Sequence, residues 1–351
     1  MEKLKLQFYP YTFARVSVMK AKLIPRHEYD KLVKMELNGI TLYLENTEYK
    51  SEIDRLTLEY SGVQLLEVAL YKNLTRTFNK LKRISNEGTR RLIEEYLKRM
   101  DIWNIKTLIR GKYTKMDDDQ IRNFLIPVGV LTEEKLEQLL EMDTISEIID
   151  NLKIFEEKYF KQGYEYFEQT NSLVLLENQI DIAYYKEILE FIKTIPKQGK
   201  LFSEFLGMEI DFLNIRNLVK LKLAGFEEDK IRQFIFFSGR YIPKNQLEDL
   251  IGAKDLKRLM EKLKKTEYGA ILKESIAHFE ETGELSELDL VIENYLLKKA
   301  DFLPHAALLS VNNILGYMFA KELEIKNLQK IIKSKQLGMS EEFIRKQIVA
   351  G

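Results

Sequence analysis

The sequence predicts an all-α fold built from a threefold internal repeat, and two observations lead to this prediction. Helix breakers are sparse, with 6 Pro and 16 Gly among 351 residues of which 45% are hydrophobic. A polar helical motif also recurs, with its second copy beginning 110 residues after the first and its third 113 residues after the second. The three copies are Asp101–Lys112, Asp211–Lys222 and Glu324–Lys335. Repetition at a fixed interval sets the architecture of a chain.

The helices can be placed in chain order from proline positions and apolar spacing. The first lies between Pro10 and Pro25, because proline interrupts a helix from within. The next covers residues 65–81, where apolar side chains recur at spacings of three and four and predict a buried stripe. The three motif helices follow, and an Ile-Arg pair comes after each motif at the same offsets. These pairs are Ile121–Arg122, Ile231–Arg232 and Ile344–Arg345.

Weaker similarities extend each repeat and suggest how it closes. Residues 47–49 resemble residues 266–268, and residues 14–22 can be laid on residues 104–112 at an offset of 90. The chain would then begin with the tail of one repeat and end with the head of another, which favours a closed three-part ring over an open solenoid. We therefore expect an N-terminal region with the first repeat at 1–155, a second repeat at 156–268, and a third at 269–351 completed by N-terminal residues.

An acidic residue and an asparagine three positions later define each motif. An acidic residue that precedes a helix accepts hydrogen bonds from the first backbone N–H groups, so we interpret these positions as helix N-caps. Two alternatives remain: each Asn forms a buried hydrogen bond to the neighbouring repeat, or contacts a partner directly. The residues concerned are Asp101, Asn104, Asp211, Asn214, Glu324 and Asn327.

Basic residues end each motif. Cations near helix C-termini interact favourably with the helix dipole, which is a sufficient structural reason for them. They could instead form a positive ring around an acidic partner surface, and this is the candidate partner interface. Its residues are Arg110, Lys112, Lys220, Lys222, Lys333 and Lys335.

The composition argues against several function classes. Lys plus Arg equals Asp plus Glu at 55 each, so no global basic field attracts nucleic acid. Cysteine is absent, and the three histidines are far apart in sequence. There is no phosphate-binding glycine loop or dinucleotide fingerprint, and apolar runs are too short for a membrane span. We expect no catalytic residue, no cofactor and no metal, and any membrane role to be peripheral.

Four stretches together resemble the C subunit of the A/V-type rotary ATPases: Tyr11–Leu23, Glu67–Leu81, Tyr96–Lys112 with Leu125–Gly129, and Leu309–Lys335. The resemblance implies three pseudo-threefold-related helical domains that form a funnel or socket. It implies a non-catalytic central-stalk protein, present in one copy, that couples the central axle subunits to the membrane proteolipid ring for proton or sodium transport. It also implies a location on the cytoplasmic side, peripheral to the membrane.

The third motif departs from the family pattern at Gln329 and Ser334, which puts the surface of the third domain in doubt. A helical-repeat scaffold that binds other partners is the alternative function.

Overall fold

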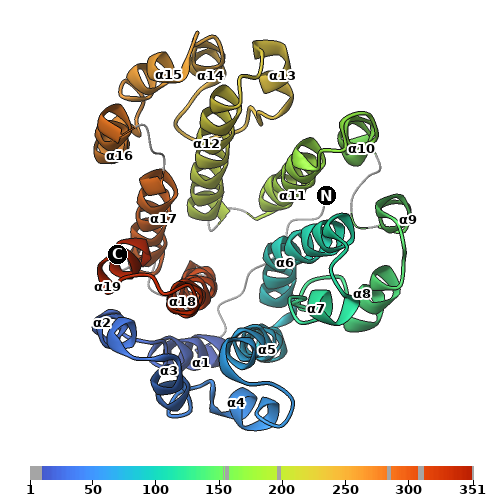
Figure 1. The fold of residues 1–351 in the computed structure, drawn as a ribbon, viewed down its shortest axis with the longest axis vertical. Coiled ribbons are helices and arrows are strands. Elements are labelled where there is room, and N and C mark those ends of the chain that lie inside the picture. Colours follow the sequence, from blue (N-terminus) through green and yellow to red (C-terminus); the bar gives the residue numbers. More distant parts are fainter. Residues whose placement is uncertain are drawn as a thin grey trace. The chain divides into compact units, whose positions relative to one another are not determined.

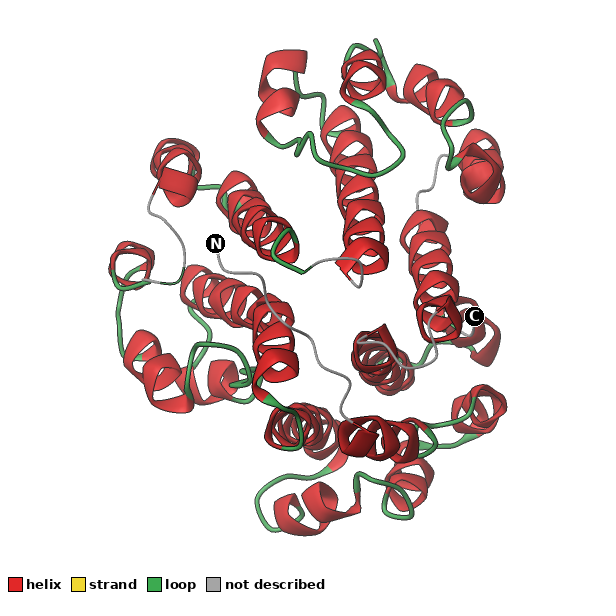
Figure 2. Cartoon of the chain, turned by 180° about the vertical axis from the view of Figure 1, so that it is seen from behind, coloured by secondary structure: helices red, strands yellow, loops and turns green. Residues whose placement is uncertain are grey.

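The computed structural model describes residues 10–152, 154, 158–195, 199–282, 286–306 and 312–349. Within these ranges the chain forms helices α1 to α19 and no strand (Figures 1 and 2), which confirms the all-α prediction. Residues 309–311, the start of the last family-like stretch, lie outside them. The chain divides into two compact units. The main segment of unit 1 is Glu156–Phe302, and unit 2 combines Leu4–Phe155 with Leu303–Ala350.

Unit 2 is built from both ends of the chain. The C-terminal helix α18 packs against α5, α1 and α3, and α19 packs against α2; Figure 1 shows the red C-terminal helices beside the blue N-terminal ones. The helices of this unit are α1 (Pro10–Lys20), α2 (Arg26–Lys34), α3 (Leu37–Leu44), α4 (Lys50–Leu56), α5 (Gly62–Arg83), α6 (Glu87–Thr114), α7 (Asp118–Arg122), α8 (Glu133–Leu140), α9 (Ile145–Asp150), α18 (Asn312–Gln336) and α19 (Glu341–Gln347).

Unit 1 holds the second repeat. Its α10 packs against α11, and α12 packs against α11, α13 and α15. The helices are α10 (Lys158–Thr170), α11 (Val174–Ile192), α12 (Gly199–Leu223), α13 (Glu228–Gln233), α14 (Lys244–Ile251), α15 (Leu256–Leu263), α16 (Gly269–Thr282) and α17 (Ser286–Ala306), the last of which continues four residues beyond the unit boundary.

Local sequence explains where the long helices begin and what they bury. The apolar stripe predicted in residues 65–81 lies on α5, and its members are buried, Leu66, Phe78 and Leu81 completely. Helix α6 begins after Asn86, whose side chain accepts a hydrogen bond from the Thr89 N–H at 3.0 Å. Burial of such a stripe contributes roughly 25 cal/mol for each Å² of apolar surface removed from water.

The three motifs occupy the same place in three long helices, α6, α12 and α18. Each long helix is followed by a short one, α7, α13 or α19, whose isoleucine is fully buried. These are Ile121, Ile231 and Ile344, the isoleucines of the predicted Ile-Arg pairs. The N-cap interpretation of Asp101 and Asp211 is wrong, because both lie in the interior of their helices and are completely buried.

Candidate structural and interaction sites

A reciprocal pair of hydrogen bonds holds the asparagine of each motif. The Asn104 side-chain amide donates to the Ile126 carbonyl at 2.8 Å, and its Oδ1 accepts from the Ile126 N–H at 2.7 Å. In all three repeats the partner lies 22 residues further along the chain. The other two pairs are Asn214 with Phe236 at 2.8 and 2.9 Å, and Asn327 with Val349 at 2.9 and 3.0 Å.

The acidic residue of the first motif holds the loop that follows α7. The Asp101 carboxylate accepts from the Val130 N–H at 2.8 Å and the Leu131 N–H at 3.0 Å. The loop has no helical or strand partner for these N–H groups, so a buried acceptor from α6 satisfies them. Asp101 and Asn104 together anchor this loop to one face of the helix.

The second motif repeats this arrangement and adds a tyrosine. One oxygen of Asp211 accepts from the N–H groups of Arg240 at 3.0 Å and Tyr241 at 2.7 Å, and from the Tyr268 hydroxyl at 2.8 Å. The two loop residues lie 29 and 30 positions after the carboxylate, as they do in the first repeat.

Glycine lets each loop approach its carboxylate closely. A Cβ on Gly129 would collide with the Asp101 carboxylate, and a Cβ on Gly239 would collide with that of Asp211. The two glycines are 110 residues apart, so the close approach is itself part of the repeat. Any larger residue would push the loop away from its hydrogen-bond acceptor.

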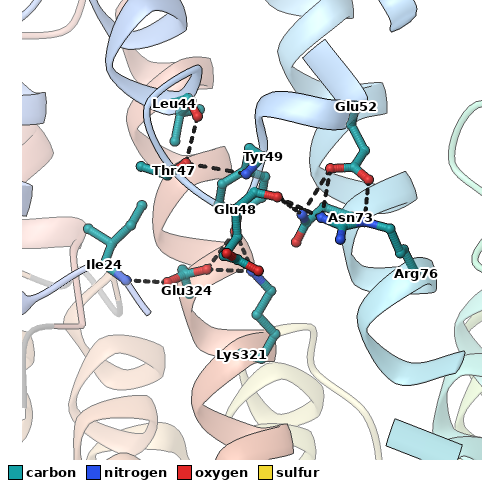
Figure 3. A network of polar contacts seen from close by, with 10 residues as sticks. All are labelled: Ile24, Leu44, Thr47, Glu48, Tyr49, Glu52, Asn73, Arg76, Lys321 and Glu324. Carbon is teal, nitrogen blue, oxygen red and sulfur yellow. Dashed lines mark hydrogen bonds and ion pairs between the residues drawn. The ribbon is translucent and has the colours of Figure 1, made fainter. Parts of the chain in front are cut away.

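In the third motif a glutamate replaces the aspartate, and N-terminal residues supply its partners (Figure 3). Glu324 accepts from the Ile24 N–H at 2.5 Å and from the Tyr49 hydroxyl at 2.6 Å. The Lys321 ammonium donates to the same carboxylate at 2.6 Å and to the Tyr49 hydroxyl at 2.9 Å. The side chains of Lys321 and Glu324 are almost completely buried, so each charge depends on the other.

Tyr49 and Tyr268 play the same part in two repeats, since each donates its hydroxyl to the acidic residue of a motif. This pairing matches the resemblance between residues 47–49 and 266–268. The Ile24 N–H correspondingly stands where loop N–H groups stand in the other repeats. The third carboxylate thus takes its backbone donor from the N-terminal part of the chain rather than from a loop downstream.

A second polar cluster fixes the segment that carries Tyr49. The Asn73 amide donates to the Glu48 carbonyl at 2.7 Å and to the Glu52 carboxylate at 3.0 Å. Arg76, one turn further along α5, donates to the same carbonyl at 2.7 Å and to Glu52 at 2.5 Å. The carbonyl and the carboxylate of this segment are thus both held by α5, and Tyr49 is presented to α18 in a fixed position.

An ion pair also recurs at the arginine that follows each buried isoleucine. Arg122 of α7 reaches Glu137 of α8 at 2.9 Å, and Arg232 of α13 reaches Glu248 of α14 at 3.0 Å. Arg345 of α19 lies 3.5 Å from Asp30, which is on the N-terminal helix α2. The third repeat therefore uses α2 where the others use α8 and α14.

Burial changes the acidity of several of these groups. Burial raises the pKa of Asp101 to about 6, against the opposing effect of its two backbone N–H donors. Burial likewise raises the pKa of Asp211. Burial and the nearby Glu324 raise the pKa of Tyr49 well above its ordinary value, so its hydroxyl remains a hydrogen-bond donor at every physiological pH.

The predicted basic interface residues lie in the last turns of α6, α12 and α18 or one turn before. Two of them form ion pairs within the chain, Lys112 with Asp118 at 2.7 Å and Lys333 with Glu67 at 3.0 Å. Arg110, Lys220 and Lys333 are exposed, whereas Lys112, Lys222 and Lys335 are half-buried. Exposure thus follows the repeat, and the exposed member is the same in each motif.

Both alternatives for the motif asparagines are also wrong. Each amide uses its oxygen and its nitrogen on the backbone of its own repeat rather than as a bridge to the next. All three are buried, which excludes direct contact with a partner. In sequence, an acidic residue three positions before an Asn looks the same at a helix start and on a buried helix face, and only the tertiary structure distinguishes them.

Sequence reasoning missed Lys321 and the two loop glycines. Lys321 carried no signal, because a lysine on a helix is ordinarily solvated. Gly129 and Gly239 could have been found, since they stand at the same offset as the motifs. No group of three or more His, Asp or Glu side chains suited to a metal occurs among the described residues. Within the same ranges, no helix is long and apolar enough to cross a membrane.

Two surface cavities lie within the units. One of about 770 Å³ in unit 1 is lined by Lys186, Lys193, Lys200 and Ser238, among others. One of about 240 Å³ in unit 2 is lined by Gln64, Met116, Asn123 and Phe124, among others. Neither gathers an arrangement of nucleophile, base and oxyanion donors.

Comparison with known proteins gives consistent matches along the whole chain. The family described as ATP synthase (C/AC39) subunit matches residues 12–347. The C subunit of the A-type ATP synthase of Methanosarcina barkeri is 35% identical over 97% of this chain and 92% of its own length. The corresponding proteins of Methanococcoides burtonii, 35% identical, and Haloquadratum walsbyi, 32% identical, also align over 97% of this chain, and over 94% and 97% of their own lengths.

Proposed function

The chain belongs to the ATP synthase (C/AC39) subunit family, and on that premise we propose that it is a non-catalytic central-stalk subunit of an A/V-type ATPase. It couples the central axle subunits to the membrane proteolipid ring and transmits torque for ATP-linked proton or sodium transport. One copy serves each complex, on the cytoplasmic side and peripheral to the membrane. The relatives' printed name supports this proposal at the level of the complex.

The observation that carries the coupling role is the way the same buried contacts are built three times. A part that transmits torque must resist shear, and each repeat ties a loop to a long helix through buried, reciprocal hydrogen bonds. In the third repeat these ties join N-terminal and C-terminal segments, through Glu324 with Ile24 and Arg345 with Asp30. A body whose segments are tied in this way transmits force with little loss in local unfolding.

The proposed architecture is three helical domains related by a pseudo-threefold axis that form a funnel or socket. Its domains are the N-terminal region with the first repeat (1–155), the second repeat (156–268) and the third (269–351), completed by N-terminal residues. The recurring Asn pair, the carboxylate site and the arginine ion pair support this division. Superposition of the three repeats in an experimental structure of the complex would test it.

Reconstitution tests the function directly. Purified axle subunits and proteolipid rings are mixed with and without this chain, and ATP-driven ion uptake into vesicles is measured beside ATP hydrolysis. We expect hydrolysis without uptake when the chain is absent, and uptake to return when it is added. A chain that binds neither axle nor ring, or that leaves uptake unchanged, would contradict the proposal.

We further propose that the exposed basic residues of the motifs, Arg110, Lys220 and Lys333, face an acidic part of the axle. Exposed charges steer association and are screened by salt. Replacing two of the three by Glu should weaken axle binding about tenfold at roughly 50 mM salt and by less than about twofold at roughly 500 mM, with unchanged helicity. Glu at the exposed Lys50, outside the motifs, is the control.

A further inference from the structure

All three motif helices end in the same C-terminal turn. The residue after the helix has a left-handed backbone, with φ of 55° at Lys115, 74° at Gly225 and 67° at Gly338. The next N–H then bonds back to a carbonyl five residues earlier, from Met116 to Gly111 at 2.9 Å. The matching bonds run from Phe226 to Leu221 at 3.0 Å and from Met339 to Ser334 at 2.9 Å.

The residue that donates this N–H is apolar in every repeat, although the turn does not require it. In this type of turn the apolar residue ordinarily packs on a side chain at the position of the accepting carbonyl. That position is Gly111 in the first repeat and Ser334 in the third, neither of which offers an apolar surface. Met116 and Met339 are accordingly 40% and 42% exposed. Phe226 is less exposed and packs edge-on against Phe234.

Other exposed apolar side chains gather at the same turns. Of thirteen large apolar residues exposed in the described part of the chain, six lie at these turns or on the short helix after them. We call the three sites the helix-end corners, and their exposed apolar members are Tyr113 and Met116 in the first repeat, Leu223 in the second, and Leu337, Met339 and Phe343 in the third.

The charges around the corners largely cancel. Lys112 is paired with Asp118 at 2.7 Å in the first corner, and Arg232 is paired with Asp229 at 2.9 Å in the second. In the third, Arg345 is paired with Glu341 at 3.3 Å. Each corner therefore offers an apolar centre with a charge-balanced rim, which suits an apolar partner surface better than a charged one.

A single chain that carries the same apolar corner three times fits a partner that is itself repetitive. An asymmetric axle offers a given element once, whereas a ring of identical subunits offers it many times. We infer that the helix-end corners are the contacts with the proteolipid ring, each receiving an apolar side chain from a polar-face loop of one ring subunit. This inference rests on the proposed function and adds to it which surface meets the ring and by which chemistry.

The test measures binding of the full chain to purified rings in lipid nanodiscs. Met116→Glu, Leu223→Glu and Met339→Glu are made singly and together. We expect each single change to weaken binding about tenfold and the triple variant at least about a hundredfold. The controls are Leu58→Glu and Leu42→Glu, which alter residues 92% and 61% exposed outside the corners, and binding should stay within about twofold. Thermal melting checks that every variant is folded.

Three outcomes separate the possibilities. A wild-type chain that does not bind rings contradicts the proposed function. A wild-type chain that binds, together with a triple variant that binds equally well, overturns this inference alone. Because the contact is apolar, wild-type affinity should change less than about threefold between roughly 50 and 500 mM salt, and a steep loss with salt would also overturn it. Met116→Leu, which keeps the apolar surface, should bind like the wild type.

Discussion

At the scale of single residues, the buried carboxylates are the least ordinary feature of the chain. Asp101 is completely buried, and its negative charge is balanced by two backbone N–H groups and more distant lysines. Glu324 occupies the equivalent position with a buried lysine beside it. The same loop-anchoring role is thus performed with and without an adjacent counter-ion, at a higher cost of desolvation where none is present.

Asp101→Asn should remove a pH dependence of stability. The folded pKa of about 6 exceeds the ordinary value of 3.8, so the neutral form is the one the fold favours. The stability due to this group is complete below about pH 4 and is lost as pH rises through about 6. The advantage of the wild type over Asp101→Asn in free energy of unfolding should therefore shrink by about 2–3 kcal/mol between roughly pH 4 and 7.

Urea denaturation at several pH values measures this difference. Asp211→Asn should show a trend in the same direction, since burial raises that pKa also. A difference between wild type and Asp101→Asn that stays constant across the pH range would contradict the assignment.

At the scale of elements, the ends of the motif helices are equivalent in geometry but not in residue type. The left-handed position is glycine at the ends of α12 and α18 and lysine at the end of α6. A side chain there costs about 1 kcal/mol relative to glycine, because Cβ crowds the following carbonyl. At Gly225 and Gly338 a Cβ would meet nothing within 4 Å, so only the backbone conformation favours glycine.

Lys115→Gly should accordingly raise the free energy of unfolding by about 0.5–1 kcal/mol. Gly225→Ala should lower it by about 1 kcal/mol. Lys115→Ala, which removes the same side chain but keeps the Cβ, is the matched control and should leave stability nearly unchanged. If Lys115→Ala stabilised as much as Lys115→Gly, loss of the charge rather than relief of the backbone would be the cause.

At the scale of the whole molecule, the chain is organised by contacts between its ends. Unit 2 needs both Leu4–Phe155 and Leu303–Ala350, whereas unit 1 is nearly one continuous segment. Helix α18 covers α5, and its Glu324 satisfies the Ile24 N–H and the Tyr49 hydroxyl. Without α18 these groups and the apolar face of α5 would be left without partners.

The two units should therefore differ when expressed as fragments. Residues 156–302 should fold alone with a cooperative thermal transition, followed by circular dichroism. Residues 1–155 should be helical but melt without cooperativity until a second fragment, residues 303–351, is added. A sharp transition for residues 1–155 alone, with the midpoint seen in the full chain, would show that the ends do not depend on each other.

The sequence by itself determined the helical class, the threefold recurrence and the family, because helix periodicity and fixed offsets are local properties of the chain. It also linked residues 47–49 with residues 266–268, whose tyrosines both bind a motif carboxylate. Only the tertiary structure decided what the motif does. The distinction between a helix cap and a buried anchor depends on a loop 22 to 30 residues away, and the partners of Glu324 lie 275 and 300 residues away. Contacts at such separations are set by how the helices pack, which no local pattern records.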